Sequence, residues 1–440
     1  MIFQTLGDLL WVLLFFPLFS LCSLRLFPGF LRLLVAGSKA KGGSGKEEPG
    51  TISGRQAAAA TLAATIGTGN IIGTAQAIAM GGPGAVFWMW IAALLGFSVK
   101  CAEIWFGQQT GGAMATITAA LGKSFGHFYA LLSVLSTLLV GNMAQMNTVI
   151  SSLTAVAPDR SCLPLVWSII LLLLIAISLF GGIRSLGRIC SILVPVMALL
   201  FLACSFCIMF SDRENILPCL REILLDAWHP KAAFGASGGL ALRSTLLWGF
   251  RRGAFSNEAG LGTAGTVHSL VRTADPDKHA LWGILEIGVD TLLLCTVSAL
   301  TLLCSKVQIP FGTLPGAELW FQVCSCSSKP AALTWILSLC LLFFGISTVL
   351  GCYVPGTLSA AWIGLDENRY RVLFLLCTVF GCFLPTELIW LSSDWINVLM
   401  AVPNLLSMVL LATQWEKDCE QSKNILENRD SSLARRERKV

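Results

Sequence analysis

Residues 64–74 read Ala-Thr-Ile-Gly-Thr-Gly-Asn-Ile-Ile-Gly-Thr, and residues 255–263 read Phe-Ser-Asn-Glu-Ala-Gly-Leu-Gly-Thr. Both stretches place glycine and small polar residues in the middle of long apolar segments. Glycine costs a helix interior about 1 kcal/mol relative to alanine, and clustered glycine frees backbone groups that hydrocarbon cannot satisfy. We therefore expect two broken helices, each facing a cavity or other protein rather than lipid.

The composition around these stretches indicates a membrane protein. The 440 residues are 55% hydrophobic and 12% charged, whereas soluble domains carry about 25% charged residues. Runs such as 163–180 and 192–210 are apolar on every side, which predicts spanning helices and not an alternating β-barrel. The first run, 9–24, is followed rather than preceded by Arg25 and Arg32. This order is the reverse of a signal peptide, so we interpret the run as a retained helix.

The apolar runs predict an all-α integral membrane protein of about eleven transmembrane helices, with boundaries uncertain by about two to four residues. These helices are expected near residues 7–33, 55–80, 84–108, 126–154, 164–181, 188–211, 239–270, 281–304, 331–352, 370–389 and 393–414. Loop Lys and Arg residues fall on one side of this arrangement, which predicts that this side is cytoplasmic and the N-terminus outside. The basic tail lands on the same side and is interpreted as a topology signal, not a nucleic-acid site.

The breaks organise the chain into two halves. Counted from Arg55, the first break falls in core helix one and the second in core helix six. An odd number of helices per half inverts the second copy, the topology in which discontinuous helices build a site at the bilayer midplane of transporters. The predicted parts are a leading helix (1–35), a cytoplasmic linker (36–54), a core (55–414) of two repeats (55–211 and 239–414) and a tail (415–440).

A single glycine cluster would fit close helix packing equally well. Two clusters at matched positions, one of them carrying Glu258, favour a functional site, because a buried carboxylate needs a partner. The nearest candidate partners are Arg251 and Arg252. A membrane enzyme using Glu258 and Asp290 as acid and base is a weaker alternative, since no nucleophile with a neighbouring base accompanies them. A channel is the other alternative.

Most of the sixteen cysteines lie inside apolar runs and are interpreted as packing residues. Cys324 and Cys326 lie in a polar loop, and whether they pair stays open. Two thiols without further ligands at suitable spacing are a weak metal signal. His268 and His279 flank a loop on the predicted cytoplasmic side and are expected to be solvated.

With these motifs the chain resembles the alanine or glycine:cation symporter family, which has the leucine-transporter fold with inverted repeats. The long matches are 67–70, 81–90 continuing to Lys100 and Glu103, and 252–262, and the weaker ones are 141–145, 181–184, 344–348 and 397–405. Residues 112–116 and Cys352 depart from the family pattern. The resemblance implies a non-enzymatic symporter of a bacterial inner membrane that imports alanine or glycine with sodium by alternating access. Proton coupling, or a preference for glutamine or serine, is the alternative, and the oligomeric state stays open.

The resemblance also implies a site. The substrate carboxylate would be held by backbone N–H groups at the first break, where a half-helix dipole favours an anion. The predicted substrate-binding residues are Thr68, Gly69, Asn70, Thr74, Gln145, Ser256 and Asn257, with Gln76 less favoured. The fold's shared sodium site would use Ala63, Ile66, Phe344, Ser347 and Thr348. Ordinary back-bonding of Ser347 and Thr348 to the preceding turn is an equal alternative.

Five carboxylates receive predictions. Glu258 and Asp290, with Arg252, are expected to support the broken helix. Glu103 is expected to pair with Lys100 near the membrane interface. The role of Glu286, deep in core helix seven, stays open. Asp394, near the start of core helix ten, would line the pathway or cap the helix.

Overall fold

The computed structural model describes residues 7, 9–39, 52–156, 163–229, 238–273, 275–305, 307–327, 330–384 and 386–437, and the regular elements in these ranges are helices. The first half contains η1 (Trp11–Phe15), α2 (Phe16–Lys39), α3 (Gly54–Thr65), η2 (Gly69–Gly73), α4 (Thr74–Gly81), α5 (Ala85–Thr110), α6 (Ala113–Leu121), α7 (Lys123–Leu138), η3 (Leu139–Met143), α8 (Ala144–Val156), α9 (Leu163–Phe180), α10 (Gly182–Ser211), η4 (Arg213–Asn215) and α11 (Ile216–Asp226). The second half contains α12 (Gly238–Asn257), α13 (Thr263–His268), α14 (Pro276–Ala280), α15 (Trp282–Ile287), η5 (Gly288–Cys295), α16 (Thr296–Cys304), α17 (Ala317–Ser325), α18 (Pro330–Trp362), α19 (Glu367–Gly381) and α20 (Thr386–Glu437).

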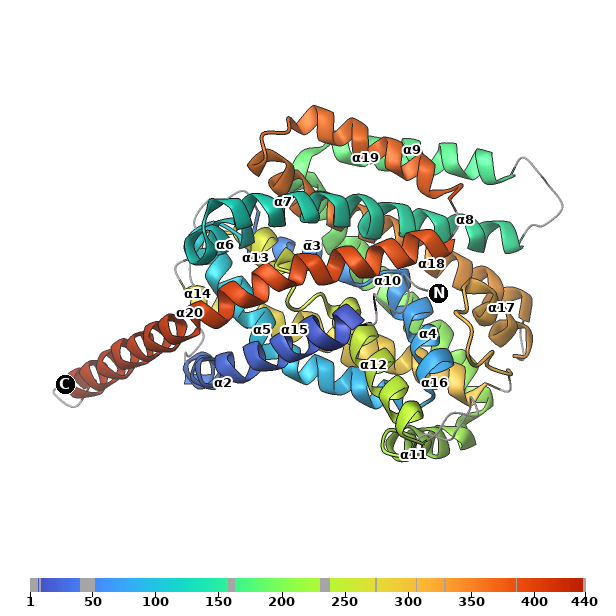
Figure 1. Ribbon diagram of the computed structural model, residues 1–440, viewed down its shortest axis with the longest axis horizontal. Coiled ribbons are helices and arrows are strands. Elements are labelled where there is room, and N and C mark those ends of the chain that lie inside the picture. Colours follow the sequence, from blue (N-terminus) through green and yellow to red (C-terminus); the bar gives the residue numbers. More distant parts are fainter. Residues whose placement is uncertain are drawn as a thin grey trace.

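Several long helices, among them α7, α8 and α20, run along the long axis of the molecule, whereas α4 and α12 are steeply inclined to it (Figure 1). Seven of the described helical stretches are long and apolar enough to cross a bilayer, and α9 is a shorter apolar helix. This arrangement agrees with the prediction of an all-α, multi-pass membrane protein. The total of about eleven spans stays a prediction.

Five predicted helices differ by six or more residues at an end. α2 continues to Lys39 rather than 33, and α19 ends at Gly381 rather than 389. α10 begins at Gly182 rather than 188, α18 continues to Trp362 rather than 352, and α20 continues to Glu437 rather than 414. The last part of α20, predicted as a tail, is therefore helical and projects beyond the bundle (Figure 1). Of the predicted linker, residues 40–51 lie outside the described residues.

The first break interrupts the helix that begins at α3. A capping box formed by Ser53 and Gln56 starts α3, because each residue's side chain accepts a hydrogen bond from the other's backbone N–H. The helix stops at Ile66, whose ψ of 90° is extended. A π-helical turn, η2, then leads into α4. Two further π-helical turns, η3 and η5, interrupt the helices α7–α8 and α15–α16.

The second break separates α12 from α13. Gly260 and Gly262 have φ values of 93° and 80°, which glycine adopts without strain. Glu258 has φ 53° and is the one non-glycine residue with positive φ among those described. Such a conformation in a carboxylate residue marks a functional or strained position.

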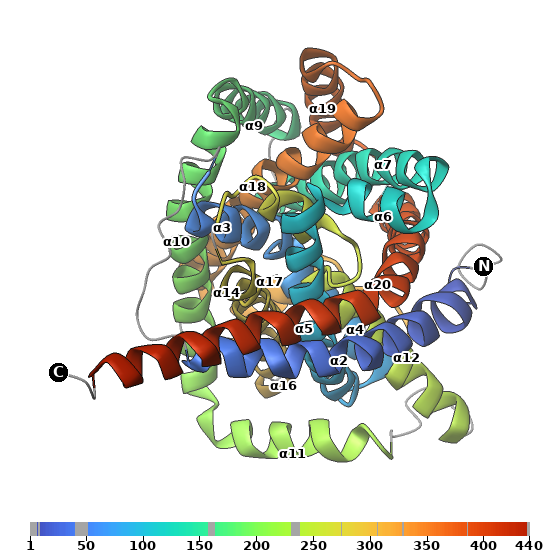
Figure 2. The ribbon, with the colours of Figure 1, turned by 90° about the vertical axis from the view of Figure 1, so that its left-hand side faces the viewer.

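Two large apolar clusters form the interior. One includes Ile66 and Ile71 of the first break, and the other includes Ala259 and Leu261 of the second. α13 packs against α3, and α12 packs against η2, so the breaks meet where the clusters adjoin. α11 lies across one side of the bundle (Figure 2).

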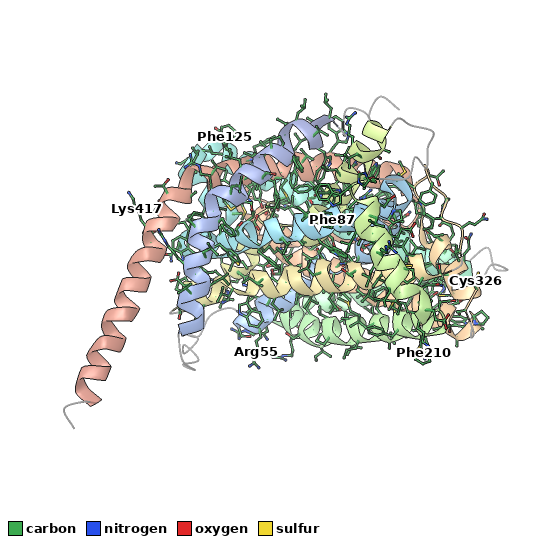
Figure 3. All side chains as sticks on the ribbon, turned by 90° about the horizontal axis from the view of Figure 1, so that it is seen from below. Arg55, Phe87, Phe125, Phe210, Cys326 and Lys417 are labelled. Atoms are coloured by element: carbon green, nitrogen blue, oxygen red, sulfur yellow. The ribbon has the colours of Figure 1, made fainter. Side chains whose placement is uncertain are left out.

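Two basic residues from distant parts of the sequence lie towards the same end of the bundle. Figure 3 shows Arg55, Phe125 and Lys417 towards one end and Phe210 and Cys326 towards the other. The basic residues Arg55 and Lys417, far apart in sequence, therefore share an end.

Candidate functional site

Side-chain amides satisfy the backbone groups that the first break frees. Asn70 Oδ1 accepts a hydrogen bond from the Gly67 N–H at 2.9 Å. Gln145 Oε1 accepts from the Thr68 N–H at 3.1 Å and from the Thr68 hydroxyl at 2.9 Å. Gln145 reaches this position from α8, while Thr74 Oγ1 donates to the Asn70 carbonyl at 2.8 Å. The break is thus closed by acceptors, as a buried backbone N–H requires.

A buried carboxylate joins the two broken helices. Asp290, in η5, accepts from Asn70 Nδ2 at 2.6 Å and from Ser256 Oγ at 2.7 Å. Thr291 Oγ1 donates to the same carboxylate at 2.8 Å. Asn70 belongs to the first broken helix and Ser256 to the second, so Asp290 connects both. Both of its oxygens are hydrogen-bonded, as a buried carboxylate requires.

Glu103 holds the second break, so its predicted pairing with Lys100 at the interface is wrong. The side chain is 4% exposed, and its Oε1 accepts from the N–H groups of Gly260 (2.8 Å) and Gly262 (2.9 Å) and from Asn404 Nδ2 (2.8 Å). Asn404 also donates to the Gly260 carbonyl at 2.9 Å. A carboxylate accepting several N–H groups is a strong, charge-assisted arrangement.

Lys100 reaches the second break from the same helix, α5. Its fully buried ammonium donates to the Asn257 carbonyl at 2.9 Å and lies 3.8 Å from Glu286. Tyr129 donates to the Leu261 carbonyl at 2.6 Å. Carbonyls freed at the break are therefore matched by donors from neighbouring helices.

Arg251 and Arg252 face Asp394, and the prediction that they partner Glu258 is wrong. Arg251 Nη2 forms a close ion pair with Asp394, and Arg252 Nη1 lies 3.7 Å from the same carboxylate. α20 begins at Thr386, so Asp394 lies within the helix and not at its start. Glu258 instead accepts a 2.6 Å hydrogen bond from the Thr263 hydroxyl.

A narrow cavity of about 20 Å³ lies between the two breaks. Its lining includes the site candidates Gly69, Gln145, Ser256, Glu258 and Thr348. The backbone of Gly67, the ring of Phe255 and the thiol-bearing Cys352 also line it. A space of this size holds about one water molecule, so the two breaks pack closely together in this conformation.

The predicted sodium residues meet beside this cavity. Thr348 Oγ1 donates to the carbonyls of Ile66 (3.2 Å) and Phe344 (2.9 Å), and Ser347 Oγ donates to Phe344 at 3.0 Å. A Cβ on Gly351 would lie 2.9 Å from the Ala63 carbonyl carbon, so α3 and α18 are in contact there. The hydroxyls of Ser347 and Thr348 thus bond back to the preceding turn, and the Thr348 hydroxyl also meets the Ile66 carbonyl oxygen. The assignment of these residues to a sodium site stays a prediction.

Two predicted substrate residues point elsewhere in this conformation. Asn257 is fully buried, its Oδ1 accepts from the Ala259 N–H, and its Nδ2 would lie 3.7 Å from a Cβ on Gly96 of α5. Gln76 Nε2 donates to the Pro315 carbonyl at 3.3 Å, away from the breaks. Sequence reasoning did not find Phe255 or Asn404, because an aromatic or amide side chain in an apolar run carries no signal of its partner.

His268 and His279 are buried, so their predicted solvation is wrong. Cys324 is buried, Cys326 is exposed, and both are free thiols. Among the residues described, no group of three or more His, Cys, Asp or Glu side chains could hold a metal ion.

Comparisons with known proteins agree with this architecture. The sodium/alanine symporter AgcS of Methanococcus maripaludis is 35% identical over 382 residues, covering 82% of each chain. The probable sodium/glutamine symporter GlnT of Bacillus subtilis is 32% identical, covering 84% of this chain and 78% of GlnT. The crystal structure of MhsT in complex with L-phenylalanine superposes with a TM-score of 0.62 at 13% identity, covering 84% of this chain and 98% of MhsT. The profile of the sodium:alanine symporter family matches residues 3–432, and the chain is a member of that family, a transporter with the leucine-transporter fold and not an enzyme.

Proposed function

We propose that this protein is a sodium-coupled symporter that imports a small neutral amino acid, alanine or glycine, by alternating access. The observation that carries this proposal is the convergence of the two broken helices on one narrow cavity, which Gly69, Ser256 and Glu258 line. The names of the relatives AgcS and GlnT support sodium coupling but differ in the amino acid. The description of the family, sodium:alanine symporter, favours alanine.

We propose a place for each end of the substrate, and the geometry of the two breaks supports it. Gln145 Oε1 accepts from the Thr68 N–H and hydroxyl, and a substrate carboxylate oxygen is the same type of acceptor. We assign the carboxylate to these donors, with Gln145 moving aside when it binds. The ammonium is assigned to Ser256 and Glu258, which line the opposite wall through the second broken helix. Sodium is assigned to the oxygens around Thr348.

The proposed transport cycle moves the predicted repeats 55–211 and 239–414 against one another around this site. The chain is placed in a bacterial inner membrane with the N-terminus outside and the tail cytoplasmic. The shared end of Arg55 and Lys417 supports this orientation. An epitope tag after Val440 should be accessible to antibody only in permeabilised cells. Labelling of the tag in intact cells would show that the orientation is the opposite one.

Uptake in proteoliposomes tests the function. Purified protein should accumulate labelled alanine or glycine when a sodium gradient is directed inward and not when choline replaces sodium. Unlabelled alanine and glycine should compete more strongly than serine or glutamine. Absence of sodium-driven uptake of any small amino acid would refute the proposal.

A matched pair of variants tests the site itself. Ser256→Ala removes a cavity hydroxyl and should raise the half-saturating amino-acid concentration about tenfold, the effect of about 1.4 kcal/mol. Ser151→Ala removes an exposed hydroxyl that donates to the Asn147 carbonyl, and it should behave as wild type. Equal effects of both changes would remove Ser256 from the site.

A further inference from the structure

A chain of buried titratable side chains leads away from the second break. His268 Nδ1 lies 2.8 Å from His279 Nε2, and His268 Nε2 lies 2.7 Å from Glu286 Oε1. Glu286 faces Lys100, whose ammonium holds the Asn257 carbonyl. His268, Glu286 and Lys100 are at most 1% exposed, whereas His279 retains 6% of its surface. The transport site described above uses none of these four side chains directly.

Hydrogen-bond chemistry fixes the protons in this chain. Glu286 as a carboxylate only accepts, so His268 must carry its proton on Nε2. His268 Nδ1 is then an acceptor, which requires the proton of His279 to sit on Nε2. An added proton bound at His279 Nδ1 allows the Nε2 proton to pass to His268 Nδ1. The His268 Nε2 proton can in turn pass to Glu286 Oε1, and each transfer breaks one N–H bond as the next bond forms.

The charges around these hydrogen-bonded side chains favour the binding of an added proton. α5 contributes Lys100 and Glu103, α15 contributes Glu286, η5 contributes Asp290, and the second break contributes Glu258. Four carboxylates against one ammonium leave three negative charges in a buried region. Burial makes unbalanced charge expensive, so one added proton relieves the repulsion.

Other charged groups near these elements lie at the surface. On α14, Asp275 and Lys278 form an ion pair, each 36% exposed. Asp277 accepts from Trp105 Nε1, and Arg55 is exposed in the first turn of α3. α6 and α18, which also pack against α13, have no charged residue in their sequences. α2, which packs against α14, carries Arg32, which has a partner of its own.

The geometry points to a proton-binding site formed by His279, His268 and Glu286, whose proton competes with sodium for the negative charge around the second break. This inference rests on the sodium-coupled transport proposed above. Sodium binding beside Thr348 adds a positive charge next to the cavity that Glu258 lines. Because the effect of one ligand on another is reciprocal, sodium binding releases the proton and acidity weakens sodium binding.

The main test is the sodium concentration that half-saturates uptake of labelled alanine or glycine, whichever the symporter accumulates, in proteoliposomes between pH 5.5 and 8.5. Wild type should require about fivefold more sodium at the acid end, a typical coupling between two sites. Glu286→Gln mimics the protonated acid, so its sodium requirement should be independent of pH and close to the acid value of wild type. His127→Gln is the matched control, because His127 is exposed and contacts the Lys123 carbonyl. This control should keep the wild-type profile.

A second measurement does not depend on the assembly of Glu286→Gln. Sodium added to purified wild type in weakly buffered detergent should release protons, detected with a pH dye. His279→Gln keeps a donor for His268 Nδ1 but removes the outer ring nitrogen, so its release should be about tenfold slower or more. A pH-independent sodium requirement, or no proton release from wild type, would overturn the proton site while leaving sodium-driven transport in place. Absence of sodium-dependent uptake at every pH would instead refute the proposed function.

Discussion

Replacement of Glu103 by glutamine tests whether one carboxylate holds the second break. Its Oε1 accepts three hydrogen bonds, from Gly260, Gly262 and Asn404, within 2.8–2.9 Å. A charge-assisted hydrogen bond is worth about 1 kcal/mol more than a neutral one, so the three together lose about 3 kcal/mol. Oε2 has no hydrogen-bond partner, so the new amide NH₂ would be buried unsatisfied, at about 1 kcal/mol or more. Glu103→Gln should therefore destabilise the fold by about 4 kcal/mol.

Denaturant titration in mixed micelles measures this free energy of unfolding, with sodium-driven uptake recorded on the same preparation. The matched control is Glu367→Gln, because Glu367 is 51% exposed and pairs with Arg371 at the surface. Such surface pairs contribute about 0–1 kcal/mol. The free energies of unfolding of Glu103→Gln and of the control could instead agree within about 0.5 kcal/mol, with wild-type transport by Glu103→Gln. This result would show that the carboxylate does not hold the break.

Three further changes probe separate contacts. Thr348→Ala, alone or with Ser347→Ala, should raise the sodium concentration needed for half-maximal uptake about tenfold, the loss of one oxygen ligand, and an unchanged sodium dependence would remove both residues from the ion site. Gly351→Ala should lower thermal stability, because its Cβ would lie 2.5 Å from the Ala64 nitrogen, whereas Gly288→Ala meets nothing within 4 Å and serves as control. Asp394→Asn removes the carboxylate that faces two buried guanidinium groups, and it should cost about 3–5 kcal/mol of stability by denaturant titration.

The positions of the broken helices were predictable because their signal is local. Glycine and small polar residues in hydrocarbon have few physical solutions, and the breaks at 66–68 and 258–262 lie inside the two predicted stretches. The ranges of the helices could be predicted from the lengths of the apolar runs. The end of α20 could not be predicted in this way, because its polar last turns extend beyond the apolar run.

The partners of the charged residues were not predictable in this way. Glu103 meets Gly260 across 157 positions of sequence, and Arg251 meets Asp394 across 143. Sequence reasoning favoured near neighbours such as Lys100, because only short separations have a fixed geometry on a helix. His268 was expected in water because it precedes a loop, yet the short α14 brings His279 back onto it.

The π-helical turns η2, η3 and η5 have a mechanical consequence. Each turn holds one residue more than an α-helical turn, and η2 and η3 contribute Gly69 and Gly141 to the cavity wall while η5 carries Asp290. When the extra residue shifts by one position along the helix, the side chain at that position rotates about the helix axis by about 100°. The helix on either side keeps its hydrogen bonds. The three helices that contain these turns can therefore twist locally. Such twisting would change the shape of the cavity wall without unwinding any of the helices.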